Sequence, residues 1–272
     1  MINQLLKIKL QIKVDSPLIH CITNPISIND CANIVLAAGS KPIMAEHPDE
    51  VEEITALSQA LAVNLGNITD VRIKSMMLSG KVAAISKIPS IIDVVGVGCS
   101  SLRLNYAKEY ICKNKPSAIK GNMSEIKSLC NMDSHSVGID AGNDDVINAN
   151  TLVRNSEIVR ELSLATGAVV VATGKIDIIS DGRKTYSIKN GIEIMSHITG
   201  TGCMLNVLIA SYISSGRILE GVILGTAALG ISGELSRDVK GTGSFKTALL
   251  DNLYTLTDES IKESIKLEEV TI

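Results

Sequence analysis

The stretch with the clearest chemical potential is the glycine-flanked turn Ile-Thr-Gly-Thr-Gly-Cys at residues 198–203. A largely apolar segment follows up to Gly216, and this pattern predicts a tight turn that runs into a buried helix. The first N–H groups of a helix lack partners within it, and the helix dipole is positive there. We therefore expect Gly200, Thr201 and Gly202 to form a site that stabilises an anion.

Cys203 falls in the first turn of that predicted helix. A partly exposed thiol at this place would have its thiolate favoured by the same field, which would suit it to chemistry. The alternative is a small side chain that only packs, and for an isolated Gly-Thr-Gly-Cys segment this alternative is the more common. Residues elsewhere in the chain are needed to choose between a chemical and a packing role for Cys203.

Composition excludes several classes of function. The 272 residues are 45% hydrophobic and 20% charged with a net charge of −3, which is typical of a globular protein. With no basic run, one Phe and no Trp, nucleic-acid binding is not expected. The apolar runs 203–213 and 218–231 are short and interrupted, so we expect no membrane span. Six scattered cysteines without a CxxC pair or a secretory signal indicate reduced thiols in the cytoplasm, and the four histidines offer no zinc spacing.

Short apolar runs alternate with segments of helix length, and this alternation predicts an α/β fold with a layered, mostly parallel sheet flanked by helices. Predicted strands cover residues 17–23, 42–44, 61–65, 90–95, 117–121 and 168–172, with a hairpin of 176–179 and 184–188. Predicted helices cover 6–14, 26–38, 50–58, 69–81, 101–112, a segment from Asn122, 144–165, 202–215, 218–237 and 244–263. No linker divides the chain, so we expect one domain over residues 1–272.

Ligands of such folds bind beyond the carboxyl ends of the strands. Polar residues and glycines gather at nearly all of these predicted ends: Asn24, Met44, 64–66, 93–98, 120–125 and 173–175. The sequence therefore predicts one site that is built from several loops along the same edge of the sheet.

Together these loops resemble the hydroxyethylthiazole kinase family of the ribokinase-like superfamily. The resemblance runs in order through PLIHCITN (17–24), PIMA (42–45), NLG (64–66), DVVGVG (93–98), IKGNMSE (119–125), VATG (171–174), DG (181–182), TGTGC (199–203) and GTGSFK (241–246). It implies a ribokinase-like fold and transfer of the γ-phosphoryl group of ATP, with Mg²⁺, to the primary alcohol of 4-methyl-5-(2-hydroxyethyl)thiazole in thiamine biosynthesis or salvage. The GTGSFKT segment is not a Walker A motif, because Phe245 stands where a second glycine is needed.

The resemblance also implies roles for individual residues. Cys203 matches the position at which ribokinase relatives carry a base, and Gly200 to Gly202 would donate N–H groups to the transferring phosphoryl group. The implied metal carboxylates are Asp93 and Glu125, the ATP contacts are Lys120 and Thr173, and the thiazole contacts are Asn24, Ile26, Met44 and Gly200. The chain departs from the family pattern at Val94, where proline is usual, and at Pro25, where an aromatic residue is usual.

Three alternatives remain open: a ribokinase-like kinase of hydroxymethylpyrimidine, an NAD(P)H-hydrate dehydratase, and a nucleotide-binding regulatory module without turnover. The segment from Asn24 to Met44 argues against the first two, and the intact 200–203 turn with both carboxylates argues against the third. The resemblance further implies a homotrimer with active sites between subunits, in which the N-terminal pocket residues would face the Cys203 loop of another chain.

Overall fold

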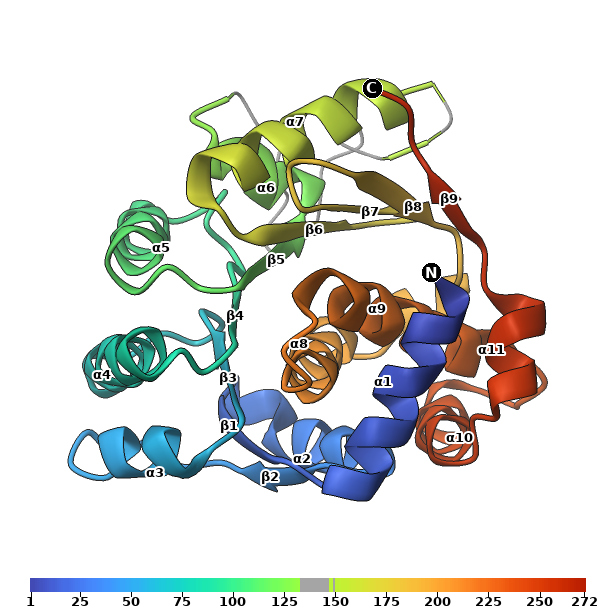
Figure 1. Ribbon diagram of the computed structural model, residues 1–272, viewed down its shortest axis with the longest axis horizontal. Coiled ribbons are helices and arrows are strands. Elements are labelled where there is room, and N and C mark those ends of the chain that lie inside the picture. The colour runs from blue at the N-terminus through green and yellow to red at the C-terminus, as the bar shows by residue number, and fades with distance from the viewer. Residues whose placement is uncertain (133–146, 149) are drawn as a thin grey trace.

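A nine-stranded sheet, flanked by helices on both faces, organises the part of the chain that the computed structural model describes, residues 1–132, 147–148 and 150–272 (Figure 1). The strands are β1 (Leu18–Ile22), β2 (Lys41–Ile43), β3 (Ala60–Asn64), β4 (Ser90–Asp93), β5 (Ala118–Asn122), β6 (Val169–Thr173), β7 (Asp177–Ser180), β8 (Thr185–Ile188) and β9 (Leu267–Glu269). Their order in the sheet is β2-β1-β3-β4-β5-β6-β7-β8-β9. The first six strands in this order are parallel, and the last three pair antiparallel.

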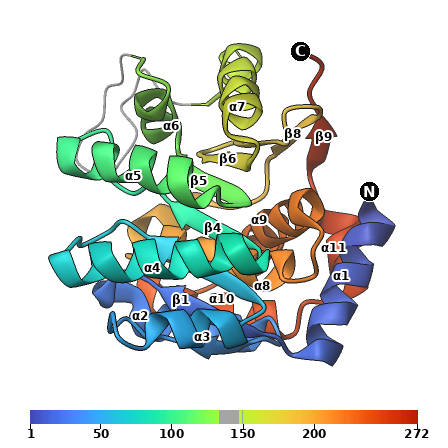
Figure 2. The same cartoon turned by 60° about the vertical axis from the view of Figure 1, so that its left-hand side comes forward.

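The helices of the described residues form two layers. They are α1 (Ile2–Asp15), α2 (Ile28–Ala37), α3 (Val51–Leu57), α4 (Asp70–Ser86), α5 (Ser101–Asn114), α6 (Met123–Leu129), α7 (Leu152–Thr166), α8 (Thr201–Ile213), α9 (Ile218–Leu235), α10 (Thr242–Tyr254) and α11 (Asp258–Ser264), with short 3₁₀ helices η1 (Pro25–Ser27) and η3 (Glu193–His197). The sheet curves around α8 and α9, while α3, α4, α5 and α7 cover its opposite face (Figures 1 and 2).

Strand alternation divides the core into two clusters, one on each face of the sheet. In β3, Ala60 and Ala62 face the cluster that contains α8 and α9, whereas Leu61 and Val63 face the cluster that contains α4 and α5. All five residues of β3 are buried, as a parallel strand covered on both faces requires. The continuous apolar runs of the sequence are explained by this double coverage.

Helix α9 is long and apolar enough to cross a membrane by length and composition, but 78% of its most apolar window is buried inside the fold. Figure 1 shows it enclosed by the sheet, α1, α8 and α10. Burial on all sides explains why it is apolar all round, since a helix with one solvent face would alternate.

Most predicted elements are confirmed, and the differences have local causes. The predicted helix 144–165 is wrong at its start: residues 144–146 lie outside the described residues, and the helix begins only at Leu152. The Asn148 side chain accepts the N–H groups of Asn150 and Thr151, which forms a turn in place of a helix. The predicted helix 244–263 is two helices, because the Thr257 hydroxyl caps α11 at the Ser260 N–H.

Three short elements at the edges were not predicted from the sequence. Strand β9 carries only Leu-Glu-Glu and pairs with β8 at the end of the sheet. The 3₁₀ helix η1 precedes α2, so the predicted helix 26–38 begins in a tighter turn, and η3 leads into the turn at Gly200.

Gly221 of α9 allows a close approach to α8, and this contact yields a stability prediction. A Cβ atom at Gly221 would lie 2.8 Å from the Ile213 nitrogen and 2.9 Å from the Tyr212 carbonyl carbon, both of which are backbone atoms. We expect Gly221→Ala to destabilise the protein by about 1–3 kcal/mol through overpacking, as measured by urea unfolding. Gly243→Ala is the control, because no atom lies within 4 Å there, and it should be neutral or stabilising by up to ~1 kcal/mol.

Candidate active site

A row of three polar side chains crosses the carboxyl edge of the sheet. In the strand register, Asn64 of β3 pairs with Asp93 of β4, and Asp93 pairs with Lys120 of β5. Asn64 Nδ2 donates to Asp93 Oδ2 over 3.0 Å, and Lys120 Nζ donates to the same oxygen over 2.8 Å. The predicted convergence of these strand ends is therefore confirmed for Asp93 and Lys120.

The Asp93–Lys120 ion pair is fully enclosed, since Asp93 is 0% exposed and Lys120 is 4% exposed. Burial raises the pKa of the Asp93 carboxyl, and Lys120 opposes this by favouring the carboxylate. Burial works to lower the pKa of Lys120, but the carboxylates of Asp93 and Glu125 raise it overall. Asp93 Oδ1 is buried without a hydrogen-bond partner among the described residues, so this oxygen has a lone pair to offer a ligand.

The predicted turn and helix at 200–213 are confirmed as α8, and the turn contacts the polar row. Gly200 has φ +91°, a conformation that favours glycine, and it is the residue before the first turn of α8. Asn64 Nδ2 lies 3.5 Å from Cys203 Sγ, and a Cβ atom on Gly202 would lie 3.4 Å from Lys120 Nζ. The Thr201 hydroxyl lies within 2.9 Å of the carbonyls of Met195 and Ile198, which commits it to holding the turn.

Partial exposure, the condition under which the sequence favoured a thiolate at Cys203, is not met in the structure. Cys203 is 8% exposed, and burial together with the nearby Asp93 carboxylate raises the pKa of its thiol. Hydrogen bonds from Ser27 and Asn64 and the charge of Lys120 lower this pKa but do not outweigh burial. Burial of the thiol thus opposes the effect of the helix N-terminus on its pKa, and the sequence alone does not show this burial.

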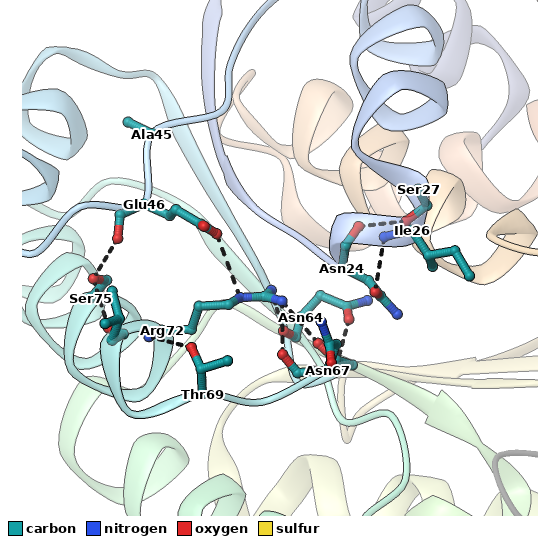
Figure 3. Close-up of polar contacts among 12 residues, drawn as sticks. Asn24, Ile26, Ser27, Ala45, Glu46, Asn64, Asn67, Thr69, Arg72 and Ser75 are labelled. Carbon is teal, nitrogen blue, oxygen red and sulfur yellow. Dashed lines mark hydrogen bonds and ion pairs between the residues drawn. The ribbon is translucent and has the colours of Figure 1, made fainter.

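Ser27 packs against Gly200 of this turn within the same chain, while Asn24, at the start of the same segment, packs against Gly66. A Cβ atom on Gly200 would lie 2.9 Å from Ser27 Cβ, and one on Gly66 would lie 2.6 Å from Asn24 Nδ2. These contacts lie within one chain, and the expectation that the N-terminal pocket residues face the Cys203 loop of another chain stays a prediction. Figure 3 shows the turn of residues 24–27, in which Asn24 Oδ1 accepts the Ile26 N–H and the Ser27 hydroxyl donates to the Asn24 carbonyl.

Glu125 belongs to a capping box at the start of α6. Its two carboxylate oxygens accept N–H groups from Gly96 at 2.8 Å and from Asn122 at 2.7 Å, while Asn122 caps the Glu125 N–H in return. Burial and the nearby Asp93 carboxylate raise the pKa of Glu125 to about 7, although these two hydrogen bonds lower it. Glu125 thus has a capping role, and this role places its side chain against the loop after β4.

The remaining predicted residues lie around this centre. The Thr173 hydroxyl ends β6 and donates to the Gly121 carbonyl over 3.4 Å. Met44 follows β2 and packs, half-buried, against the core cluster that includes Cys203. Ile26 is 70% exposed at η1, so a large apolar side chain stands at the surface beside the Asn24 turn.

Sequence reasoning missed three residues that the structure places at or near this centre. The sequence analysis places Asn64 at the end of the predicted strand 61–65 without a role, and its side chain contacts both Asp93 and Cys203. Ser27 lies beside Gly200, and Arg72 of α4 reaches back to the loop that follows β3. Strand register could have singled out Asn64, because it ends a strand next to Asp93, but nothing in the sequence distinguishes Arg72 from a solvated helix residue.

Comparisons with known proteins agree with this geometry. The pattern of the Hydroxyethylthiazole kinase family matches residues 10–259. Hydroxyethylthiazole kinase 2 of Clostridium botulinum (strain Okra / Type B1) is 58% identical over 262 residues, which are 96% of this chain and 99% of that protein. The structure of hydroxyethylthiazole kinase from Pyrococcus horikoshii OT3 superposes with a TM-score of 0.89 at 27% identity, covering 99% of this chain and 100% of that one.

A structure of a ribokinase-like superfamily protein from Enterococcus faecalis V583 has a TM-score of 0.63 at 12% identity, over 90% of this chain and 89% of that one. At this identity the likeness concerns the fold alone, and it confirms the predicted ribokinase-like architecture. The family pattern and the 58% identity go further, and with them the ordered motifs of the loops are explained. The chain belongs to the hydroxyethylthiazole kinase family.

Proposed function

We propose that this chain transfers the γ-phosphoryl group of ATP to the primary hydroxyl of 4-methyl-5-(2-hydroxyethyl)thiazole, with Mg²⁺, in thiamine biosynthesis or salvage. The observation that carries the proposal is the meeting of the 200–203 turn with Asp93 and Lys120 at one edge of the sheet, in a member of this family. Phosphoryl transfer needs positioning and neutralisation of charge more than covalent chemistry, and these groups supply both.

The phosphoryl group would lie at the N-terminus of α8. The N–H groups of Gly200, Thr201 and Gly202 would donate to its oxygens, and the Lys120 ammonium near Gly202 would neutralise part of their charge. Thr173, at the end of the strand next to β5, would add a hydroxyl to the ATP phosphates. Cys203 would accept the proton of the substrate hydroxyl, with Asn64 and Lys120 favouring its thiolate.

The metal side fits a magnesium ion that is held mainly by phosphate and water. Asp93 offers its unpartnered Oδ1, and each Glu125 oxygen keeps a lone pair beyond the N–H group that it accepts. The described residues contain no group of three or more His, Cys, Asp or Glu side chains that could hold a metal alone. Mg²⁺ keeps much of its hydration in kinases, so contacts through water suit this pair; when bound, the ion would neutralise phosphate charge.

The thiazole would lie on the N-terminal side of the turn. Asn24 and Ile26 share one turn with Ser27, which lies against Gly200, and the soft side chain of Met44 would pack against the sulfur heterocycle. The exposed Ile26 fits either a pocket wall or a subunit contact, and we propose a cytoplasmic homotrimer for the assembled enzyme. Mixing inactive Met44 and Cys203 variants tests a shared site, because only sites that draw these residues from different chains regain activity.

A coupled assay of ADP release tests the proposed function directly. We expect ADP release with ATP, Mg²⁺ and the thiazole alcohol, and little with hydroxymethylpyrimidine, with NAD(P)H hydrate or without an acceptor. Release that depends on hydroxymethylpyrimidine or on the hydrate instead would favour the two enzymatic alternatives. Release without any acceptor, or none under any condition, would also contradict the proposal.

Replacing Cys203 with alanine tests its role as the base. Because general bases contribute about 10²–10⁴-fold, we expect kcat of Cys203→Ala to fall at least 100-fold, with KM for the thiazole alcohol within about threefold. Since the thiol pKa is raised, the thiolate fraction grows as pH rises, so wild-type kcat should increase from about pH 7 to about pH 9. The alanine variant should lack this rise, and unchanged turnover in it would rule out the base.

Replacing Glu125 with glutamine tests the metal side. The amide removes the charge near Asp93, so we expect the Mg²⁺ concentration for half-maximal activity to rise by about tenfold. Asp177→Asn is the matched control: the Asp177 carboxylate also accepts a backbone N–H, from Gly174 at 2.9 Å, and burial raises its pKa to about 7 as well. The same Mg²⁺ requirement in Glu125→Gln and wild type would contradict the metal assignment.

A further inference from the structure

Arg72 is a buried cation that none of the roles above uses. It lies in the first turn of α4 and is 2% exposed, whereas an arginine on a helix is usually solvated. The Thr69 hydroxyl caps α4 by accepting the Arg72 N–H at 3.2 Å. The guanidinium therefore starts from a fixed backbone position and turns back toward the carboxyl edge of the sheet (Figure 3).

The guanidinium holds the loop that follows β3. Its Nη1 donates to the carbonyls of Gly66 at 3.0 Å and Asn67 at 3.1 Å, and its Nη2 donates to the carbonyl of Asn64 at 3.3 Å. Asn67 has φ +52°, which bends the loop so that its carbonyls converge on Arg72. This is the loop whose Asn64 side chain contacts Asp93 and Cys203.

The Nε group of Arg72 faces the loop that follows β2. Arg72 Nε has no hydrogen-bond partner among the described residues and lies 3.7 Å from Glu46 Oε2. Ser75 of α4 donates to the Glu46 carbonyl at 2.7 Å, and His20 Nε2 lies 2.9 Å from the Ala45 carbonyl. Residues 45–46 are thus fastened to α4 and β1 directly after Met44.

We propose that Arg72 is a positioning residue that fixes the thiazole-side loop (residues 44–46) relative to the phosphoryl-transfer centre. The planar guanidinium lies between the carboxylate of Glu46, on the loop after β2, and three backbone carbonyls at the end of β3 and in the loop after it. One of these carbonyls belongs to Asn64, whose side-chain amide contacts Asp93 and Cys203. This inference rests on the proposed function, because it assigns Met44 to the acceptor. A lysine could not replace Arg72, since a single ammonium cannot reach both loops with this geometry.

The test compares Arg72→Lys, Glu46→Gln and a control, Arg160→Lys. Arg160 also braces a loop, by donating to the Gly182 carbonyl at 3.3 Å, but this loop is the β7–β8 hairpin. We expect Arg72→Lys to lower kcat/KM for the thiazole alcohol by about tenfold, with KM for MgATP within about twofold. Glu46→Gln keeps the hydrogen bond from Ser75 to the backbone carbonyl of residue 46, and it should lower kcat/KM for the thiazole alcohol by about two- to fivefold. Arg160→Lys should leave kcat/KM for the thiazole alcohol and KM for MgATP unchanged.

The double variant separates positioning from general destabilisation. If Arg72 and Glu46 act through each other, the loss in Arg72→Lys/Glu46→Gln should be smaller than the product of the single losses. If Arg72→Lys changes kcat/KM for the thiazole alcohol and KM for MgATP by the same factor, or changes neither, the proposal is overturned.

If wild type does not phosphorylate the thiazole alcohol, the proposed function has failed, and amide hydrogen exchange of residues 44–47 then decides on Arg72 alone. Faster exchange in Arg72→Lys than in Arg160→Lys supports the connection between the loops, and equal exchange overturns it.

Discussion

Asp93 and Lys120 bury opposite charges beside each other inside a parallel sheet, and either charge alone would be costly to desolvate, by several kcal/mol. The pair is held by strand register, which aligns β4 with β5, and by Asn64 from β3. The Cys203 thiol and the N-terminus of α8 lie against the same three side chains. The charge balance of the whole edge therefore depends on one ion pair, whose geometry the backbone of three strands determines.

Helix α8 links this edge to the core. Its first turn contributes Cys203 and the anion-binding N–H groups, and the rest of the helix is buried between the sheet and α9. A helix that is fixed along its length cannot easily shift its first turn, because packed interiors have few voids to move into. The same close packing explains Gly221, where α9 approaches the α8 backbone. Rigidity of the catalytic turn is thus a consequence of the apolar sequence that follows it.

Much of the fold could be predicted, because strands covered on both faces leave continuous apolar runs and their carboxyl ends carry polar residues. Asp93 and Lys120 stand at such strand ends, where the family motifs assign them roles, whereas Gly200 is marked by its glycine-flanked turn before an apolar helix. Three kinds of feature could not be predicted. Strand β9 is too short to show a pattern, the pKa of Cys203 depends on burial by residues far along the chain, and Arg72 is buried only because two distant loops meet it. Each depends on tertiary contacts that leave no local periodicity.

Burial raises the pKa of the Cys203 thiol and so keeps the thiolate fraction small at neutral pH, and the course of phosphoryl transfer reconciles this with the proposed role as the base. In a loose transition state the bond to the attacking oxygen is little formed, so the hydroxyl proton is transferred late, and a thiol placed beside that hydroxyl can still act as the acceptor in its thiolate form. The larger demand is to stabilise charge on the transferring oxygens, which under the proposed function the α8 terminus and Lys120 would meet with fixed dipoles and a fixed cation. An enzyme built in this way tolerates a cysteine where a carboxylate would add a further negative charge beside Asp93. Asp93 and Glu125 already lie near the single cation Lys120, so a further carboxylate at position 203 would have no second cation to oppose it in this enclosed edge of the sheet.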